Sequence, residues 1–180
     1  EPSNLQVRVG HRGRLEMKVT VRGKAAHASA PSLGRNAIQN AARLIFGIEL
    51  LAARLATDPF LGQGTLAVTE IESQAASRNA VPDRCVFYID RRLTLGEGQE
   101  SAIAQLLSLG EVQAADAEVR LLDYEQPSWR GLVDPSKKYF PAWETAEDAP
   151  AVQAALATAS QVLGRQPRIH RSAFSSNGCA

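Results

Sequence analysis

Long hydrophobic runs are missing from this sequence of 180 residues. The longest apolar stretch, residues 44–55, is interrupted by Glu49 and Arg54, whereas a membrane-spanning helix needs roughly 20 apolar residues in a row. An excess of one charge is missing as well, because the formal net charge is +1. A nearly neutral chain has no overall field that attracts nucleic acid or an anionic membrane. We therefore expect neither a membrane nor a nucleic acid as a partner.

Cysteine is scarce, with 2 in the chain, Cys85 and Cys179. Isolated cysteines are typical of core packing in a reducing compartment rather than of a disulfide, so we expect a cytoplasmic protein. The first residues contain no secretory signal, and position 1 is Glu rather than Met. We interpret both ends of the chain as segments from the middle of a longer protein. The composition, 44% hydrophobic and 22% charged, is that of a globular protein with a core.

Apolar and polar residues alternate through residues 14–22, where Leu15, Met17, Val19 and Val21 share one face. This pattern predicts a strand with one buried face. The other expected elements are a helix from Asn36 to near Asp58, a strand at 65–72, a turn at 78–82, a strand at 85–90, a helix from Gly96 to Gly110 and a strand at 117–124.

The second expected strand has a peculiarity, since Leu66, Val68 and Ile71 share a face only if the strand contains an irregularity. The order of the elements is β-α-β-β-α-β. This order predicts an α+β, ferredoxin-like fold in which two helices cover one face of an antiparallel sheet.

The character of the sequence changes after Glu125. Residues 126–141 are rich in Pro, Trp, Tyr and Lys and have no clear period, so we interpret them as a connector in which the aromatic side chains pack. A helix follows, capped by Asp148 and ended at Gly164, and an extended piece begins at Ile169. We therefore divide the chain into a flank (1–13), the six-element module (14–125), and a connector with a helix that returns to another domain (126–180).

The loop after the first expected strand reads Gly-Lys-Ala-Ala-His-Ala-Ser-Ala-Pro over residues 23–31. His27 stands among small residues in this loop, and such an imidazole can donate a hydrogen bond to a developing oxyanion. A lone loop histidine is also commonly a solvated or structural residue, and the loop by itself leaves both interpretations open. His11 and His170 stand in polar surroundings, and we assign them no role.

Several short motifs occur in a fixed order along the chain. They are Glu-Pro-Ser-Asn at 1–4, Gly-His-Arg-Gly at 10–13, the His27 loop, Gly-Arg-Asn-Ala-Ile at 34–38, Arg-Asn-Ala-Val-Pro at 78–82, Asp-Arg-Arg at 90–92 with Gly-Glu at 96–97, and Phe-Ser-Ser-Asn-Gly at 174–178. Together they resemble the zinc-dependent metallopeptidase and deacylase family of acetylornithine deacetylase, succinyl-diaminopimelate desuccinylase, aminoacylase and carboxypeptidase G. The stretch Lys-Lys-Tyr-Phe-Pro-Ala-Trp at 137–143 resembles the selenium-metabolism hydrolase subgroup most.

The resemblance implies a catalytic domain that binds two zinc ions and an inserted ferredoxin-like lid through which two copies form a homodimer. Glu1 stands where the family has a carboxylate ligand of one metal, although an isolated carboxylate does not hold zinc tightly, and a surface glutamate is the alternative. The resemblance also implies that His27 reaches across the dimer into the neighbouring active site. There it would polarise the scissile carbonyl of a peptide or N-acyl amino acid and stabilise the tetrahedral intermediate.

The resemblance further implies two substrate-binding side chains in the module. Asn79 matches the asparagine of an Asn-x-x-Pro turn, and an ordinary turn residue is the alternative. Arg92, in the pattern Asp-x-Arg, matches the arginine that binds a substrate carboxylate, a task that suits the guanidinium fork. The alternative for Arg92 is an ion pair with Asp90 on one face of the strand.

Two further contacts with substrate lie in the flanks by the same resemblance. Arg12 is a candidate carboxylate contact or a surface charge near a hinge. The loop with Ser176, Asn177 and Gly178 matches one that offers hydroxyl and backbone N–H groups to the substrate, and a plain polar loop is the alternative.

The family's His-x-Asp ligand pair, bridging Asp, Glu-Glu pair with the general base, and late His ligand have no match in the chain. Without them there is no hydrolysis, so we expect a fragment that is inactive alone and does not bind zinc tightly. A free-standing ferredoxin-like module that dimerises or binds a small ligand is the alternative. An RNA-binding module is disfavoured because Phe87 and Tyr88 alternate and fall on opposite faces of their strand.

Overall fold

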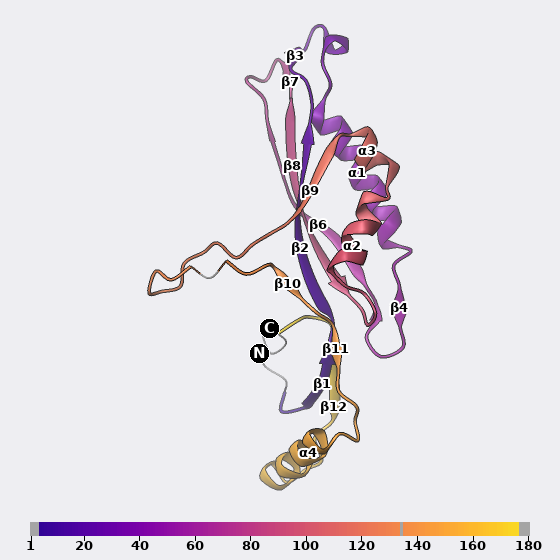
Figure 1. The fold of residues 1–180 in the computed structure, drawn as a ribbon, viewed down its shortest axis with the longest axis vertical. Coiled ribbons are helices and arrows are strands. Elements are labelled where there is room, and N and C mark those ends of the chain that lie inside the picture. The colour runs from indigo at the N-terminus through magenta and orange to yellow at the C-terminus, as the bar shows by residue number, and fades with distance from the viewer. Residues whose placement is uncertain (1–3, 134, 177–180) are drawn as a thin grey trace.

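The computed structural model describes residues 4–133 and 135–176. Its main feature is a long antiparallel sheet, which we call the long sheet (Figure 1). The long sheet contains β2 (Gly13–Arg22), β6 (Thr65–Gln74), β8 (Arg84–Leu93), β9 (Ala117–Leu121) and β10 (Tyr139–Phe140). Its strand order is β9-β2-β8-β6, and β10 pairs with β2 beyond the end of β9. This order confirms the ferredoxin-like prediction.

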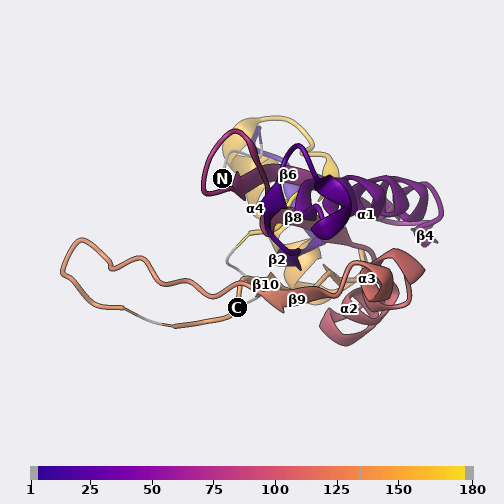
Figure 2. The same cartoon turned by 90° about the horizontal axis from the view of Figure 1, so that it is seen from above.

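Three helices lie on one face of the long sheet and leave the other face open (Figure 2). They are α1 (Ala37–Ala52), α2 (Gln99–Leu107) and α3 (Gly110–Ala114). The predicted helix that closes at Gly110 was wrong, because the chain turns after α2 and Gly110 begins α3. The predicted end of the first helix near Asp58 was also wrong. Residues 57–58 instead pair with residues 62–63 as β4 (Thr57–Asp58) and β5 (Gly62–Gln63).

The core lies between the helices and the covered face of the long sheet. The alternation in residues 14–22 is confirmed, because all four apolar side chains of that strand are buried. The core consists of Leu15, Met17, Val19, Val21, Ala37, Ala41, Leu44, Ile48, Cys85, Phe87, Ile89, Leu93, Ala102, Leu106, Val112 and Ala115. Each large apolar side chain buried in this way stabilises the fold by roughly 1.5–3 kcal/mol. The pairing of β6 with β8 shifts register between Val68 and Glu70, which confirms the expected irregularity.

A second, small sheet lies at one end of the long sheet (Figure 1). This small sheet contains β11 (Trp143–Glu144), β1 (Val7–His11) and β12 (Ile169–Ser172), with β1 in the centre, and α4 (Pro150–Leu163) packs against it. The predicted cap at Asp148 was wrong, because Ala149 is the N-cap and no side chain caps the helix. Gly164 ends the helix as predicted, with φ of 63°.

In the small sheet, the burial of His11 differs most from what the sequence predicted. The sequence suggested polar surroundings, but the side chain is 0% exposed. Because β1 lies between β11 and β12, His11 pairs with Trp143 on one side and Ser172 on the other. The Trp143 ring meets the His11 ring edge-on, with the centroids 5.3 Å apart.

The connector forms an arm that leaves the long sheet between β9 and β10, away from the helices (Figures 1 and 2). At its root Asp123 pairs with Lys137, and the Tyr124 amide donates to the Ser136 carbonyl at 2.8 Å. The expected aromatic packing was wrong for Trp129, which is 90% exposed. Tyr139 belongs to β10 instead and packs against the core.

Candidate functional site

The two polar residues His27 and Asn79 meet at the far end of the long sheet. Here β3 (Ala26–His27) pairs with β7 (Ala80–Val81), so that His27 lies opposite Ala80. The Ala28 amide also donates to the Asn79 carbonyl at 2.8 Å. This short backbone pairing sets the His27 Nε2 atom 3.4 Å from the side-chain amide nitrogen of Asn79, across 52 residues of sequence. We call this pair and its loops the tip.

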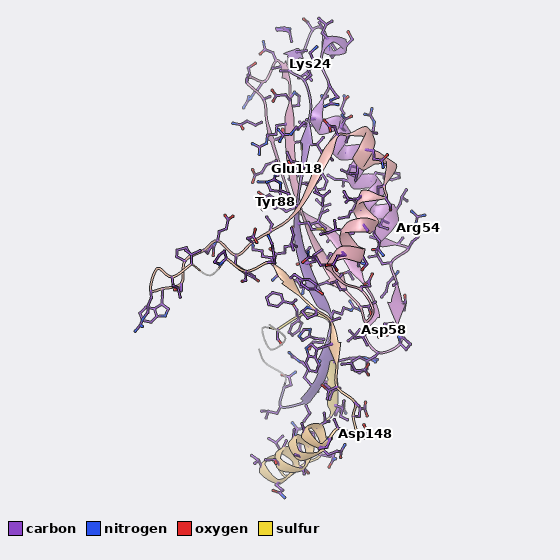
Figure 3. The ribbon with its side chains drawn as sticks, viewed as in Figure 1. Lys24, Arg54, Asp58, Tyr88, Glu118 and Asp148 are labelled. Carbon is purple, nitrogen blue, oxygen red and sulfur yellow. The ribbon has the colours of Figure 1, made fainter. Side chains whose placement is uncertain are left out.

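Two glycines allow two backbone segments to approach each other closely where the tip joins the rest of the long sheet. The Lys24 amide donates to the Arg35 carbonyl at 2.8 Å, and the Arg35 amide donates back at 2.9 Å. A Cβ atom on Gly23 would lie 2.2 Å from the Arg35 oxygen, and one on Gly34 would lie 2.7 Å from the Lys24 oxygen. Only glycine therefore permits this close approach of the two backbones, near the Lys24 side chain in Figure 3.

The orientation of His27 is set by Ser29, a residue that the sequence reasoning missed. The Ser29 amide N–H donates to His27 Nδ1 at 3.2 Å, and the Ser29 hydroxyl lies 2.8 Å from the same atom. An amide N–H can only donate, so Nδ1 is an acceptor and the neutral imidazole carries its proton on Nε2. The Asn79 amide nitrogen near Nε2 is also a donor, so these two groups form no hydrogen bond with each other, and the Asn79 oxygen accepts from the Ser77 hydroxyl instead.

The tip can act as a hydrogen-bond donor to a ligand that comes from outside. Both His27 and Asn79 are exposed, so their polar groups are accessible. An Nε2–H group whose direction is fixed is suited to donate a hydrogen bond to a negatively charged oxygen. The signal for Ser29 was present in the sequence, because a hydroxyl residue two positions after a histidine is close enough to bond its ring.

Arg92 lies at the opposite end of the long sheet, on the open face. It forms a forked ion pair with Asp90, at 2.6 Å from Nε and 3.0 Å from the second nitrogen, and its side chain is 23% exposed. Arg14, opposite Arg92 in the next strand, also donates to Asp90, at 3.2 Å. The Asp90–Arg92 ion pair considered as the alternative for Arg92 is therefore present.

Arg12 lies between the small sheet and the long sheet. Its Nε donates to the Leu61 carbonyl at 2.9 Å, and its backbone N–H donates to the Ser172 carbonyl at 3.1 Å. The structure thus places Arg12 and Arg92 at the base of the long sheet and His27 with Asn79 at the tip, far apart (Figure 1). Ser176 follows β12 at the same base, whereas Glu1, Asn177 and Gly178 lie outside the described residues.

A buried ion pair lies behind Arg92, on the covered face. Arg91 is 1% exposed and its side chain donates to Glu97 at 2.5 Å and to the Thr65 carbonyl at 3.3 Å. Burial lowers the pKa of Arg91, while the Glu97 carboxylate acts in the opposite direction. A Cβ on Gly64 would lie 2.7 Å from the Arg91 guanidinium, so the glycine gives this pair its space. Arg91 is thus part of the fold, while its neighbour Arg92 faces the open side.

The described residues do not form a metal site. Within residues 4–133 and 135–176, no group of three or more His, Cys, Asp or Glu side chains is placed to hold a metal ion. In the same part of the chain no helix is both long and apolar enough to cross a membrane. Cys85 is free and buried, and burial raises the pKa of its thiol.

Relatives in sequence include an uncharacterized protein and a protein with a hydrolase name. The chain is 43% identical over 178 residues to the uncharacterized protein YgeY of Escherichia coli, which covers 99% of this chain and 44% of that protein. It is 31% identical over 111 residues to succinyl-diaminopimelate desuccinylase 2 of Shewanella loihica, 58% of this chain and 29% of that protein. The chain therefore spans less than half the length of the relatives it matches.

Solved structures have the same fold. The aminopeptidase PepT of Bacillus cereus superimposes with a TM-score of 0.66 and 20% identity, over 97% of this chain and 42% of that one. An amidase of the hydantoinase/carbamoylase family from Burkholderia vietnamiensis gives 0.67 and 20%, over 97% and 38%. A family model described as the peptidase dimerisation domain matches residues 9–117, which is more than half of the chain. The chain therefore belongs to the M20 peptidase dimerisation domain family.

Proposed function

We propose that the chain is the lid and dimerisation portion of a two-zinc amide hydrolase that cleaves peptides or N-acyl amino acids. In this proposal residues 14–125 are the lid, and residues 1–13 and 126–180 lead into the catalytic domain. The observation that carries the proposal is the exposed His27–Asn79 pair, whose Nε2–H is held ready to donate. The family membership and the hydrolase names of the relatives support it.

His27 would donate its Nε2 proton as a hydrogen bond to the carbonyl oxygen of the scissile amide. This bond strengthens as negative charge develops on that oxygen, which lowers the barrier. The Asn79 amide would help to hold the substrate in the same cleft. Arg12 and Arg92, with the loop at Ser176, would bind the substrate carboxylate and backbone.

The tip and the base are too far apart to meet within one copy, so the proposal requires two. β6 is an outer strand of the long sheet, and its free edge can pair with another strand. Phe46 and Leu50 on α1, beside β6, are exposed and apolar. A two-fold dimer that buries this edge would carry each tip toward the partner's catalytic domain.

The zinc ions would be held elsewhere in the parent protein, because the described residues offer no metal site. By the resemblance, Glu1 would supply one ligand, and the chain alone would be inactive. The free thiol of Cys85 is in keeping with a cytoplasmic location.

Mixing two inactive variants of the full-length protein tests whether the tip works across the dimer. One partner carries His27→Ala and the other carries Glu1→Ala, and the subunits are allowed to exchange. Each mixed dimer would contain one complete site, so activity should return to about one quarter of the wild-type value for random pairing. Absence of recovery, with exchange verified by mass spectrometry, would exclude action across the dimer.

A further inference from the structure

Two covalent connections join the long sheet to the small sheet. Arg12 alone separates β1 from β2, and Pro141 and Ala142 separate β10 from β11. The two connections touch, because a Cβ atom on Gly13 would lie 2.7 Å from the Ala142 nitrogen. A pair of extended strands of this kind can bend like a hinge. The relative orientation of the two sheets therefore depends on further contacts.

One turn supplies such a contact, residues 58–62, which run from the end of β4 to the start of β5 and which we call the latch. Asp58 shapes it, since its carboxylate accepts the backbone N–H groups of Phe60 at 2.8 Å and Leu61 at 2.7 Å. The Gly62 carbonyl accepts the Thr94 hydroxyl at 3.0 Å, which ties the latch to the end of β8. The latch is thus a defined turn fixed to the long sheet, and Figure 3 labels Asp58 near the junction of the sheets.

The side chain of Phe60 extends from the latch to the small sheet, where it is half-buried. It packs against the cluster of Val9, Val152 and Leu156. A Cβ atom on Gly10 would lie 2.5 Å from the Phe60 ring, so the glycine makes the space for the ring. The Arg171 guanidinium lies 5.4 Å from the ring centroid, at the distance of a cation–π contact.

The latch also holds Arg12. The Leu61 carbonyl, next to Phe60, accepts the Arg12 Nε hydrogen at 2.9 Å. This bond uses the inner nitrogen and leaves the two terminal nitrogens without a hydrogen-bond partner among the described residues. These two terminal nitrogens can bind a carboxylate end-on through two parallel N–H···O bonds.

We propose that the latch fixes the orientation of the long sheet on the small sheet, and that Phe60 is a positioning residue for both the tip and Arg12. The effect on catalysis rests on the proposed function, but the effect on orientation does not. Because the tip lies at the far end of the long sheet, a small rotation at the latch moves His27 by a large distance. Misplacement of about 1 Å can cost on the order of 100-fold in rate.

The orientation is measured on this chain with spin labels at Glu49→Cys on α1 and Gln161→Cys on α4, in a Cys179→Ser background diluted with unlabelled chain. Phe60→Ala should broaden the distance distribution about twofold. Leu107→Ala, which truncates an exposed apolar side chain on α2, is the control and should leave the distribution narrow.

Phe60→Leu should restore most of the narrow distribution, since an apolar side chain again occupies the space. An unchanged distribution in Phe60→Ala, with only a lower Tm, would overturn the latch. In the full-length enzyme, Phe60→Ala should lower kcat about tenfold to 100-fold and raise KM. A broadened distribution with unchanged kinetics would support the latch and contradict the proposed role of the tip instead.

Discussion

The two ends of the long sheet are built in opposite ways. At the tip, short backbone pairing positions His27 and Asn79, and their side chains remain exposed with few partners. At the base, Arg91 is enclosed by an ion pair and by carbonyl groups. The tip thus presents hydrogen-bond donors to the outside, while the base uses its hydrogen bonds to hold the fold together. Loss of the buried Arg91 at the base should therefore affect folding, and loss of His27 at the tip should affect chemistry alone.

The largest expected effect is the loss of folding free energy when the buried ion pair at the base is broken. Arg91→Ala leaves the Glu97 carboxylate buried without its partner, and breaking a buried pair in this way typically costs about 3–5 kcal/mol. Urea unfolding followed by circular dichroism should show this loss. The matched Arg92→Ala, one residue away on the open face, should cost less, because Asp90 keeps Arg14 as a partner. Equal losses in the two variants would remove the contrast between the two faces.

The next effect is on the tip. His27→Ala in the full-length protein should lower kcat by roughly 10²–10³, as loss of an oxyanion donor does. The free energy of unfolding should change by no more than about 0.5 kcal/mol, because the side chain is exposed. Ser29→Ala should give a smaller loss, since Nδ1 keeps the backbone donor. A full kcat in His27→Ala would exclude the histidine from the reaction.

The two arginines at the base should differ from each other. Arg12→Ala should raise KM roughly 10- to 100-fold, the value of a hydrogen bond to a charged group. Arg92→Ala should raise it less, because Asp90 already occupies part of its guanidinium. Steady-state kinetics with substrates that have or lack a free carboxylate measures this difference. An equal effect on both substrates would exclude carboxylate binding.

The smallest expected effect concerns Cys85, in the core between the two ends. Burial raises the pKa of this thiol above its ordinary value, so the folded state keeps the proton at a pH where the unfolded chain loses it. Stability from this group is therefore complete below the unfolded pKa and declines as the pH rises above it. Native protein should not react with a thiol reagent at Cys85 until it unfolds. Rapid labelling of the native state would show that the core opens.

The strands of the long sheet could be predicted because their alternation is local. Leu15, Met17 and Val19 point one way whatever surrounds them, and the shift near Val68 was visible in the spacing of the apolar residues. The end of α1 could not be predicted, because the turn at Asp58 depends on bonds that its side chain makes to the backbone. The helix α3 was missed because a glycine usually ends a helix, whereas Gly110 begins one.

The candidate site was predictable only in part. His27 and Asn79 could be named from motifs, but their contact depends on pairing between segments 52 residues apart. The burial of His11 could not be predicted, since it arises from β11 and β12, which come from the distant end of the chain. The hydrogen bond from Arg12 to Leu61 requires a loop that has no period of its own.

Trp129 in the arm can serve as an intrinsic fluorescence probe. The chain has 2 tryptophans, one at the exposed end of the arm and one, Trp143, half-buried in the small sheet. Emission from Trp129 reports contact with water, so it should shift to shorter wavelength when another surface covers the arm. With Trp143 replaced by Phe, this single fluorophore would reveal such a contact during dimerisation or assembly without any added label.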